Sequence, residues 1–318
     1  MPKASSLKIS DVFTISGSQI SDIYVKNKMK VHFQGMSKTL QFPHTIFLQG
    51  APTCSIGISP DGLYNRLNNS GRLILLNQNA IQLASTPFIR IDDKFFMLTT
   101  KNPTAVEGPD DVPALKNYYH PAVSEKQTSI SLATPLAQLS YKLDKVTITR
   151  KMISPLLSGD KQALMPIGVE EYEVTNTSNK AQQITLVIPR PTLVNLQEKE
   201  LKPTDQDTVY ICSTPVKGHV HKDFRDSGIR GVVMGSSECL DRMVIAIPEM
   251  TGVKIDTHPH FCLNRLKQDL LLNDDGSFYE KRNPIPNQDY GAAVSVTFTL
   301  KPKETMTIPA AIVLDFPQ

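Results

Sequence analysis

The chain has 318 residues, of which 40% are hydrophobic and 20% charged, and it contains no tryptophan. This composition excludes a disordered, collagen-like or coiled-coil protein, and the length suffices for a large buried core. The formal net charge is only +3 and the basic residues are scattered, so we expect no nucleic-acid partner.

Strand-like segments dominate the chain from its beginning, and helical periodicity is rare. Short segments of this type are 9–15, 20–25, 30–33, 73–76 and 95–98. Turn residues bound them, as in sheet proteins with many short strands. We expect residues 1–45 to add strands to the domain that follows.

The longer strand-like segments differ in pattern. Residues 146–149 and 294–300 alternate apolar and hydroxyl side chains, which predicts one buried and one wet face. Residues 184–188 and 243–247 are continuously apolar, which predicts strands covered on both faces.

One segment predicts a helix. Leucines at helical spacing occupy 263–271, and the turn sequence Asn273-Asp274-Asp275-Gly276 follows them. Together these patterns predict an all-β protein: one large antiparallel β-sandwich domain over 1–318, supersandwich-like, with one or two short helices.

The middle of the chain has an ordered series of strand and turn motifs. Residues 146–157 contain a strand and a Ser-Pro turn, 165–169 begin a second strand, and 172–178 end in Asn-Thr-Ser. Pro155 and Pro166 mark strand ends because proline cannot donate to a ladder. The Asn-Thr-Ser turn predicts a hairpin that pairs 170–174 with 184–188.

This series, with the strand, helix, Pro-rich loop and strands from 243 onward, resembles the N-terminal domain of glycoside hydrolase family 116. That family comprises the bacterial β-glucosidases and non-lysosomal glucosylceramidases, and the resemblance covers residues 45–318. In the family, a helical (α/α)6 barrel carries both catalytic carboxylates, and this sequence has no counterpart of the barrel.

The resemblance therefore implies a non-catalytic accessory domain or subunit of a glycoside hydrolase. It would pack on an (α/α)6-barrel chain or domain, with a glycoside as a candidate ligand and no hydrolysis by this chain alone. The alternative is a stand-alone binding or scaffold protein that has kept the sandwich without the enzyme.

Two loops supply candidate contacts to a partner or glycan. The family opens this domain with a glycine-rich loop, and Gly50, Pro52, Ile56 and Gly57 match its pattern, whereas Cys54, Ser55 and Ser59 replace glycines. The second candidate is the pair Tyr118 and Tyr119 in the long loop 102–121. The alternative for this pair is a loop held in place by its own tyrosines.

The acidic pairs offer no catalytic residue. Glu170 and Glu171 are adjacent on a strand, so their side chains point to opposite faces and cannot converge on one sugar. The pairs at 110–111 and 274–275 lie in predicted turns, so we expect turn or surface roles for all of these carboxylates.

Two His-x-His rows are weak candidates for a metal site. If extended, His219 with His221 and His258 with His260 each place two imidazoles on one face, and Cys262 continues the second row. However, the spacing matches no known zinc pattern, and Pro259 breaks the second strand. We therefore expect loop histidines and no metal or other cofactor, with a metalloenzyme as the second alternative function.

Cysteine usage and hydropathy predict the compartment. The four cysteines are far apart without a CxxC pair, which favours free thiols in a reducing environment. The first residues lack the apolar core of a secretion signal, and no apolar run reaches the length of a membrane helix. We expect a cytoplasmic protein without a transmembrane segment.

Overall fold

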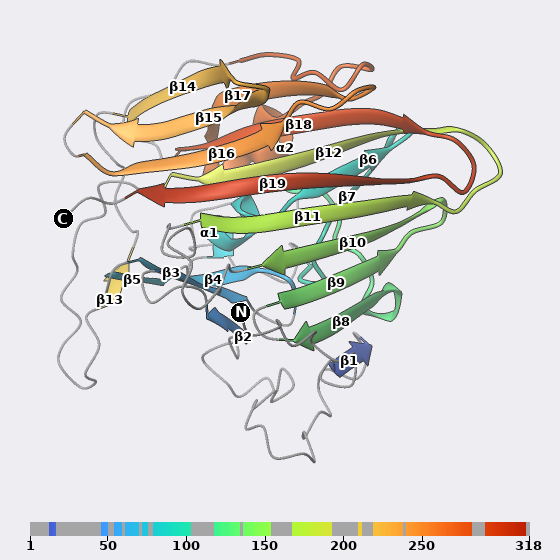
Figure 1. Ribbon diagram of the computed structural model, residues 1–318, viewed down its shortest axis with the longest axis horizontal. Helices are drawn as coiled ribbons and strands as arrows, with labels where there is room; N and C mark the ends of the chain where they lie inside the picture. Colours follow the sequence, from blue (N-terminus) through green and yellow to red (C-terminus); the bar gives the residue numbers. More distant parts are fainter. Residues whose placement is uncertain are drawn as a thin grey trace, which may run out of the picture.

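The computed structural model describes thirteen stretches of the chain. They are residues 13–16, 46–49, 54–58, 61–69, 72–75, 79–102, 118–133, 136–153, 167–192, 209–211, 219–237, 240–281 and 290–315. The chain is an all-β protein, as the sequence predicts, with two large antiparallel sheets and a smaller third sheet (Figure 1).

The larger sheet has nine strands, and every neighbouring pair is antiparallel. In spatial order they are β1 (Phe13–Ser16), β8 (Thr128–Ala133), β9 (Leu136–Lys142), β10 (Val146–Ile153), β11 (Ile167–Asn176), β19 (Thr305–Asp315), β16 (Arg242–Pro248), β15 (Ile229–Ser236) and β14 (His219–Asp226). β1 lies within 1–45 and extends the edge of this sheet through β8. Residues 20–25 and 30–33 lie outside the described residues, and the extent of the domain over 1–318 stays a prediction.

The second large sheet has five antiparallel strands. In spatial order they are β17 (Lys254–Cys262), β18 (Tyr290–Leu300), β12 (Gln182–Pro191), β6 (Phe88–Ile91) and β7 (Lys94–Met97). β17 continues through Pro259 with a register shift between His258 and Phe261, so this proline distorts an edge strand instead of ending it.

The third sheet was not expected from the sequence. It consists of β13 (Val209–Ile211), β5 (Arg72–Leu75), β4 (Tyr64–Asn69), β3 (Cys54–Ile58) and β2 (Ile46–Gln49). β13 is parallel to β5, and the other pairs are antiparallel. Much of the predicted glycine-rich loop is therefore a strand, because Cys54–Ile58 pairs on both sides.

The main hydrophobic core lies between the two large sheets. β12 and β18 are paired along their length, and every second cross-strand pair faces the core, as Ile184 with Phe298 and Leu186 with Val296 do. These side chains are buried, as are Ile148 on β10 and Ile245 on β16 in the opposing sheet. The alternation of strand side chains supplies this packing, since every second residue of each strand points into the same layer.

Part of the outer face of the five-stranded sheet is covered as well, which corrects the prediction of a wet face at Ser295 and Thr297, whereas Thr299 is exposed as predicted. Ser295 and Thr297 are buried beneath the segment that follows the helix. The Ser295 hydroxyl donates to the Gly276 carbonyl at 2.9 Å, and Arg90 donates to the carbonyls of Asn273 and Asp274 at 2.7 and 2.8 Å. The hydroxyl face binds a second layer of protein backbone, so polar alternation did not indicate solvent here.

Helices are few and short in the described part of the chain, in agreement with the sequence. They are α1 (Asn79–Ala84), η5 (Glu125–Gln127), η7 (Leu263–Arg265) and α2 (Leu266–Asp269), of which η5 and η7 are 3-10 turns. The helix predicted at 263–271 is thus one 3-10 turn and one α turn. The helix α1 was not predicted.

The predicted hairpin between 170–174 and 184–188 is wrong. β11 pairs with β10 and β19, whereas β12 pairs with β18 and β6, so the chain changes sheet between them. Asn176 holds this corner: its side-chain amide donates to the carbonyls of Lys180, Leu300 and Lys301 at 2.8, 3.0 and 3.0 Å. The turn residues were correctly identified, but they connect two layers instead of two neighbouring strands.

Candidate functional site

The candidate contacts in the glycine-rich segment receive little structural description. Gly50 and Pro52 lie outside the described residues. Ile56 and Gly57 lie in the middle of β3, and the register with β4 shifts between Gly57 and Ile58. The turn that follows is described: Gly62 has a φ of +87°, the left-handed conformation that favours glycine.

The two tyrosines of the second candidate loop lie against the core. Tyr119 is only 2% exposed, and its hydroxyl donates to the Leu263 carbonyl. Burial raises the pKa of this phenol. Tyr118 is partly buried against the same core, and its carbonyl accepts the Lys267 N–H at 2.7 Å. Tyr119 therefore fixes the described end of this segment, residues 118–121, against η7, and its ring is not on the surface.

The two adjacent glutamates face opposite sides of the sheet, as predicted. Glu171 is on the outer face beside Lys151, at 2.8 Å. Glu170 is 1% exposed and points into the core, where its Oε1 atom lies 2.8 Å from Arg150 and 2.7 Å from Arg190. The prediction of a surface or turn role for Glu170 is therefore wrong.

Glu170 is the centre of a buried charge cluster, which we define as Glu170, Arg150, Arg190 and Tyr172. The Tyr172 hydroxyl donates to the second carboxylate oxygen. Arg150 also donates to the Gly62 carbonyl at 2.9 Å, and Arg190 to the Ser85 carbonyl at 2.7 Å. Burial raises the pKa of Glu170, and the charge of Arg190 opposes that shift. This carboxylate is fully engaged and enclosed, so it cannot reach a sugar.

The structure places the candidate histidines on strands, not in loops. His221 on β14 stacks on His260 of β17, with ring centroids 4.7 Å apart and planes at 6°. Both ring nitrogens of His221 have partners: Nδ1 lies 2.6 Å from the Pro259 carbonyl, and Nε2 lies 2.9 Å from the Thr192 hydroxyl. The two rows therefore meet at one point, through a ring stack.

His258 turns away from that stack because the irregular register at Pro259 separates it from His260. Its Nε2 donates to the Glu280 carbonyl at 3.0 Å, and its Nδ1 accepts the His260 N–H at 3.3 Å. Burial lowers its pKa to about 4. Nothing is described for the His219 side chain. Among the described side chains, no group of three or more His, Cys, Asp or Glu is placed to hold a metal ion.

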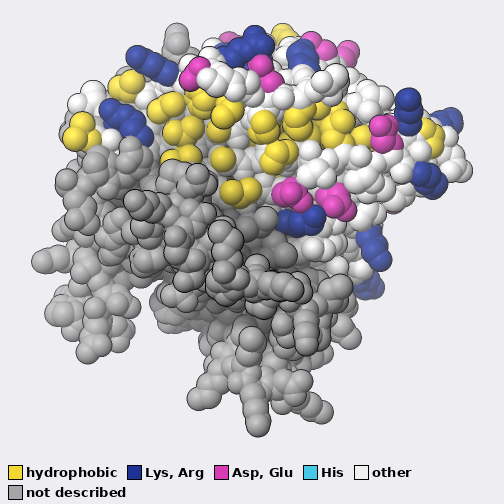
Figure 2. All heavy atoms as spheres, viewed as in Figure 1, with side chains coloured by type: hydrophobic (Ala, Val, Ile, Leu, Met, Phe, Trp, Pro, Cys, Tyr) yellow, Lys and Arg dark blue, Asp and Glu magenta, His cyan; other side chains and the backbone are white. Residues whose placement is uncertain are grey.

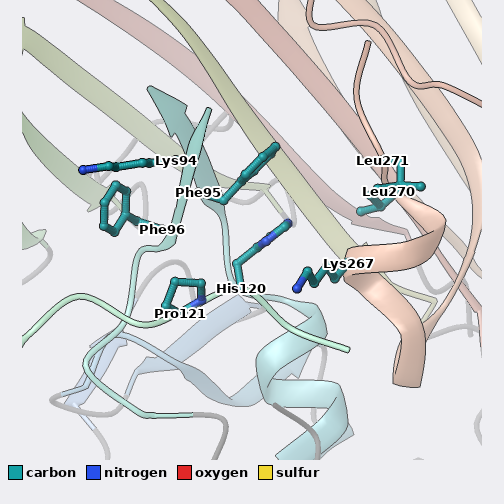
Figure 3. A pocket seen from close by; sticks show the side chains of 8 residues that line it. All are labelled: Lys94, Phe95, Phe96, His120, Pro121, Lys267, Leu270 and Leu271. Carbon is teal, nitrogen blue, oxygen red and sulfur yellow. The ribbon is translucent and has the colours of Figure 1, made fainter. Parts of the chain in front are cut away.

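A pocket of about 430 Å³ opens beside β7, the edge strand opposite β17 in the second large sheet. Figure 3 shows its lining side chains between β7, the loop around His120 and the end of α2. We call it the β7 pocket; it is lined by Lys94, Phe95, Phe96, His120, Pro121, Lys267, Leu270 and Leu271. The sequence drew attention to the neighbouring tyrosines and missed this site, because its residues come from three separate segments.

A band of apolar side chains crosses the outer face of the nine-stranded sheet. The cross-strand pairs Val169–Ala311, Val313–Val244 and Val244–Val233 join four neighbouring strands. These residues are half-buried instead of buried, and Ile229 farther along β15 is 41% exposed. Figure 2 shows the hydrophobic side chains gathered over these strands. We call this surface the outer band; it consists of Val169, Val233, Val244, Ala246, Ala311 and Val313.

The outer band corrects the prediction that 243–247 is covered on both faces. Met243, Ile245 and Ile247 are buried in the sandwich, whereas Val244 and Ala246 lie on the outer side of β16. Beyond the band, the same face becomes polar, with the ion pairs of Lys151 to Glu171 and Glu173. The face is therefore divided into an apolar and a charged part.

The described residues include no helix with the length and apolar character needed to cross a membrane.

Comparisons with known proteins give a family and a weak structural likeness. The putative kojibiose phosphorylase from human microbiome shares 11% identity at a TM-score of 0.37, over 84% of this chain and 29% of that one. Heparan sulfate lyase HepC from Pedobacter heparinus shares 11% sequence identity at a TM-score of 0.38, over 90% of this chain and 38% of that one. The GH36 α-galactosidase AgaA from Geobacillus stearothermophilus shares 9% sequence identity at a TM-score of 0.31, over 86% of this chain and 40% of that one.

The chain thus spans less than half the length of each of these structures. No curated protein matches its sequence significantly. A family model does match: it is described as beta-glucosidase 2, glycosyl-hydrolase family 116 N-term, and it covers residues 88–318. The match includes both large sheets except β1, and it begins after the glycine-rich segment. The chain belongs to the family of N-terminal domains of glycosyl-hydrolase family 116.

Proposed function

We propose that this chain is a non-catalytic accessory domain or subunit of a β-glucosidase-like glycoside hydrolase, and that it packs on a helical-barrel catalytic partner. The observation that carries the proposal is the family match over 88–318, since the family is defined by the N-terminal part of such enzymes. The enclosed state of Glu170 is consistent with a domain that supplies no catalytic carboxylate of its own from this position.

The outer band is the surface we propose for this contact. Apolar patches that cross several strands are typical of surfaces that another protein covers. The apolar side chains of β16 support this, since Val244 and Ala246 are as apolar as core residues but are only partly buried. The charged part of the face beside it would form the polar rim of the contact.

The test is reconstitution with a family 116 helical-barrel chain supplied separately. We expect the two chains to co-elute in size-exclusion chromatography, and we expect no turnover of an aryl β-glucoside by the 318-residue chain alone. Clear turnover by this chain, lost on mutation of one of its carboxylates, would contradict the accessory role.

Two variants on one strand test the surface. Ala311→Lys places a charge in the outer band, whereas Thr307→Lys places the same charge on the same face of β19, outside the band. We expect the first to reduce binding of the barrel chain at least tenfold and the second to leave it within about twofold. Equal effects would reject the band as the contact.

The alternative function is a stand-alone binding or scaffold protein. The replaced glycines at Cys54, Ser55 and Ser59 favour it, because a segment released from a catalytic neighbour is free to change. Purification from the native cell distinguishes the two, since a co-purifying helical-barrel chain supports only the accessory role. The cytoplasmic location is also a proposal, supported by the four widely spaced cysteines without a CxxC pair.

A further inference from the structure

The β7 pocket contains a buried imidazole nitrogen that has no partner in the described part of the chain. His120 is 5% exposed, and its Nε2 atom has no hydrogen-bond partner there. A buried polar atom in this state costs free energy, and such atoms in native proteins call for an explanation. His120 also lines the pocket, where a ligand atom could reach it.

The walls around this nitrogen are apolar and flat. The Phe95 ring stacks on the His120 ring, with centroids 4.5 Å apart and planes at 9°. Leu270 and Pro121 line the same space. A volume of about 430 Å³ is in the range of sites for small organic molecules. Few polar groups line the pocket, so most hydroxyl groups of a bound sugar would have no hydrogen-bond partner there.

Positive charge lies at the entrance. Figure 3 shows Lys267 beside the His120 ring, whereas Lys94 extends away from it. Burial and the charge of Lys267 lower the pKa of His120 to about 3, so the ring is neutral near pH 7. Neither lysine forms an ion pair with another described residue, and the Lys267 N–H is fixed to the Tyr118 carbonyl at 2.7 Å. The ammonium group of Lys267 is therefore available to an anion.

We propose that the β7 pocket binds a small organic anion with a flat apolar body, of the aromatic carboxylate class. The carboxylate accepts a hydrogen bond from His120 and lies near the Lys267 ammonium, and the apolar body packs on Phe95 and Leu270. This site is separate from the outer band and does not depend on the accessory function.

Titration of the full chain with cinnamate tests the proposal, with cinnamyl alcohol and phenyl β-glucoside as neutral comparisons. We expect cinnamate to bind with a Kd on the order of 1 mM or below, and to shift the side-chain NMR signals of His120. The alcohol, which lacks the charge, should bind about tenfold more weakly. Equal binding of the alcohol, or preferential binding of the glucoside, would overturn the anion assignment.

A matched pair of lysine variants locates the charge. Lys267→Met keeps most of the apolar stem of the side chain and removes its ammonium, and we expect it to weaken cinnamate binding about threefold to tenfold. Lys126→Met, at another exposed lysine outside the pocket, should leave the Kd unchanged. Both lysines are exposed, so both variants should retain the thermal unfolding midpoint of the parent. No binding at about 10 mM cinnamate, or equal binding by both variants, would reject the site.

Discussion

Arg190 on β12 forms an ion pair with Glu170 on β11, with 2.7 Å between its Nη2 atom and Oε1 of the carboxylate. The two residues belong to different sheets, and their side chains are 3% and 1% exposed. Arg150 on β10 binds the same oxygen from within the larger sheet. A buried carboxylate with two guanidinium groups therefore links the two layers of the sandwich. Such a cluster is costly to desolvate, and it stabilises the fold only while all of its members are present.

Replacing Glu170 by glutamine should destabilise the protein strongly. The variant leaves two buried guanidinium groups without their counter-charge, and we expect a loss of about 3–5 kcal/mol in the free energy of unfolding. Urea denaturation followed by circular dichroism measures this loss. Glu171→Gln is the control, because its partly exposed ion pair with Lys151 should contribute less than about 1 kcal/mol. Equal losses would show that the buried cluster has no special role.

Gly276 should not tolerate a side chain. A Cβ atom at this position would lie 1.8 Å from the Thr297 hydroxyl oxygen, so Gly276→Ala should cost about 3 kcal/mol or more. Gly252→Ala is the matched control, since its φ of +77° is close to the +79° of Gly276 but nothing lies within 4 Å of its Cβ position. We expect only the backbone cost there, about 1 kcal/mol. Thermal unfolding of both variants separates steric contact from backbone conformation.

Asn176→Ala should weaken the corner where the chain changes sheet. The variant removes the hydrogen bonds of the side-chain amide to three carbonyls, of which that of Leu300 is buried, for a loss of about 2–4 kcal/mol. Chemical denaturation measures it. Asn179→Ala lies in the same turn at an exposed position, so it should change the free energy by less than about 0.5 kcal/mol. A neutral effect of Asn176→Ala would show that the corner does not depend on this amide.

Mild acid should destabilise the protein through its buried histidines. The pKa of His258 falls from 6.5 to about 4 on folding, so between these values the unfolded chain binds a proton that the folded chain does not. The free energy of unfolding should therefore decrease as pH falls through this window, by about 1.4 kcal/mol per pH unit for this residue, and level off below about pH 4. His120, with a pKa of about 3, should add to the same trend.

Denaturation curves at pH 7, 6 and 5 measure this slope. His258→Gln retains a side-chain donor for the Glu280 carbonyl but does not titrate. The slope of its free energy of unfolding against pH should therefore be smaller, by the equivalent of about one proton taken up on unfolding. Identical slopes for the parent and this variant would contradict the assignment to His258.

The strand content of this protein was predictable because a strand depends on local patterns. The alternation at 146–149 and the apolar run at 184–188 are both strands, and Pro155 and Pro166 lie just outside β10 and β11. The opposite directions of Glu170 and Glu171 also followed from the strand alone, since adjacent side chains point to opposite faces.

Pairing, burial and sites were decided by the tertiary structure, because each depends on segments distant in sequence. The turn at Asn176 gave no indication that its partners include Leu300, or that β11 and β12 lie in different sheets. The hydroxyl face at Ser295 is buried because residues near Gly276 cover it.

The local strand patterns indicated a large all-β domain, and the family match over 88–318 agrees with it. Local side-chain alternation and turn chemistry determine that much, since they act over a few residues. The three-dimensional arrangement alone placed Glu170 between two arginines and His120 beside Phe95. Those contacts form only when separate strands and loops pack together, and a single sequence carries no direct record of such packing.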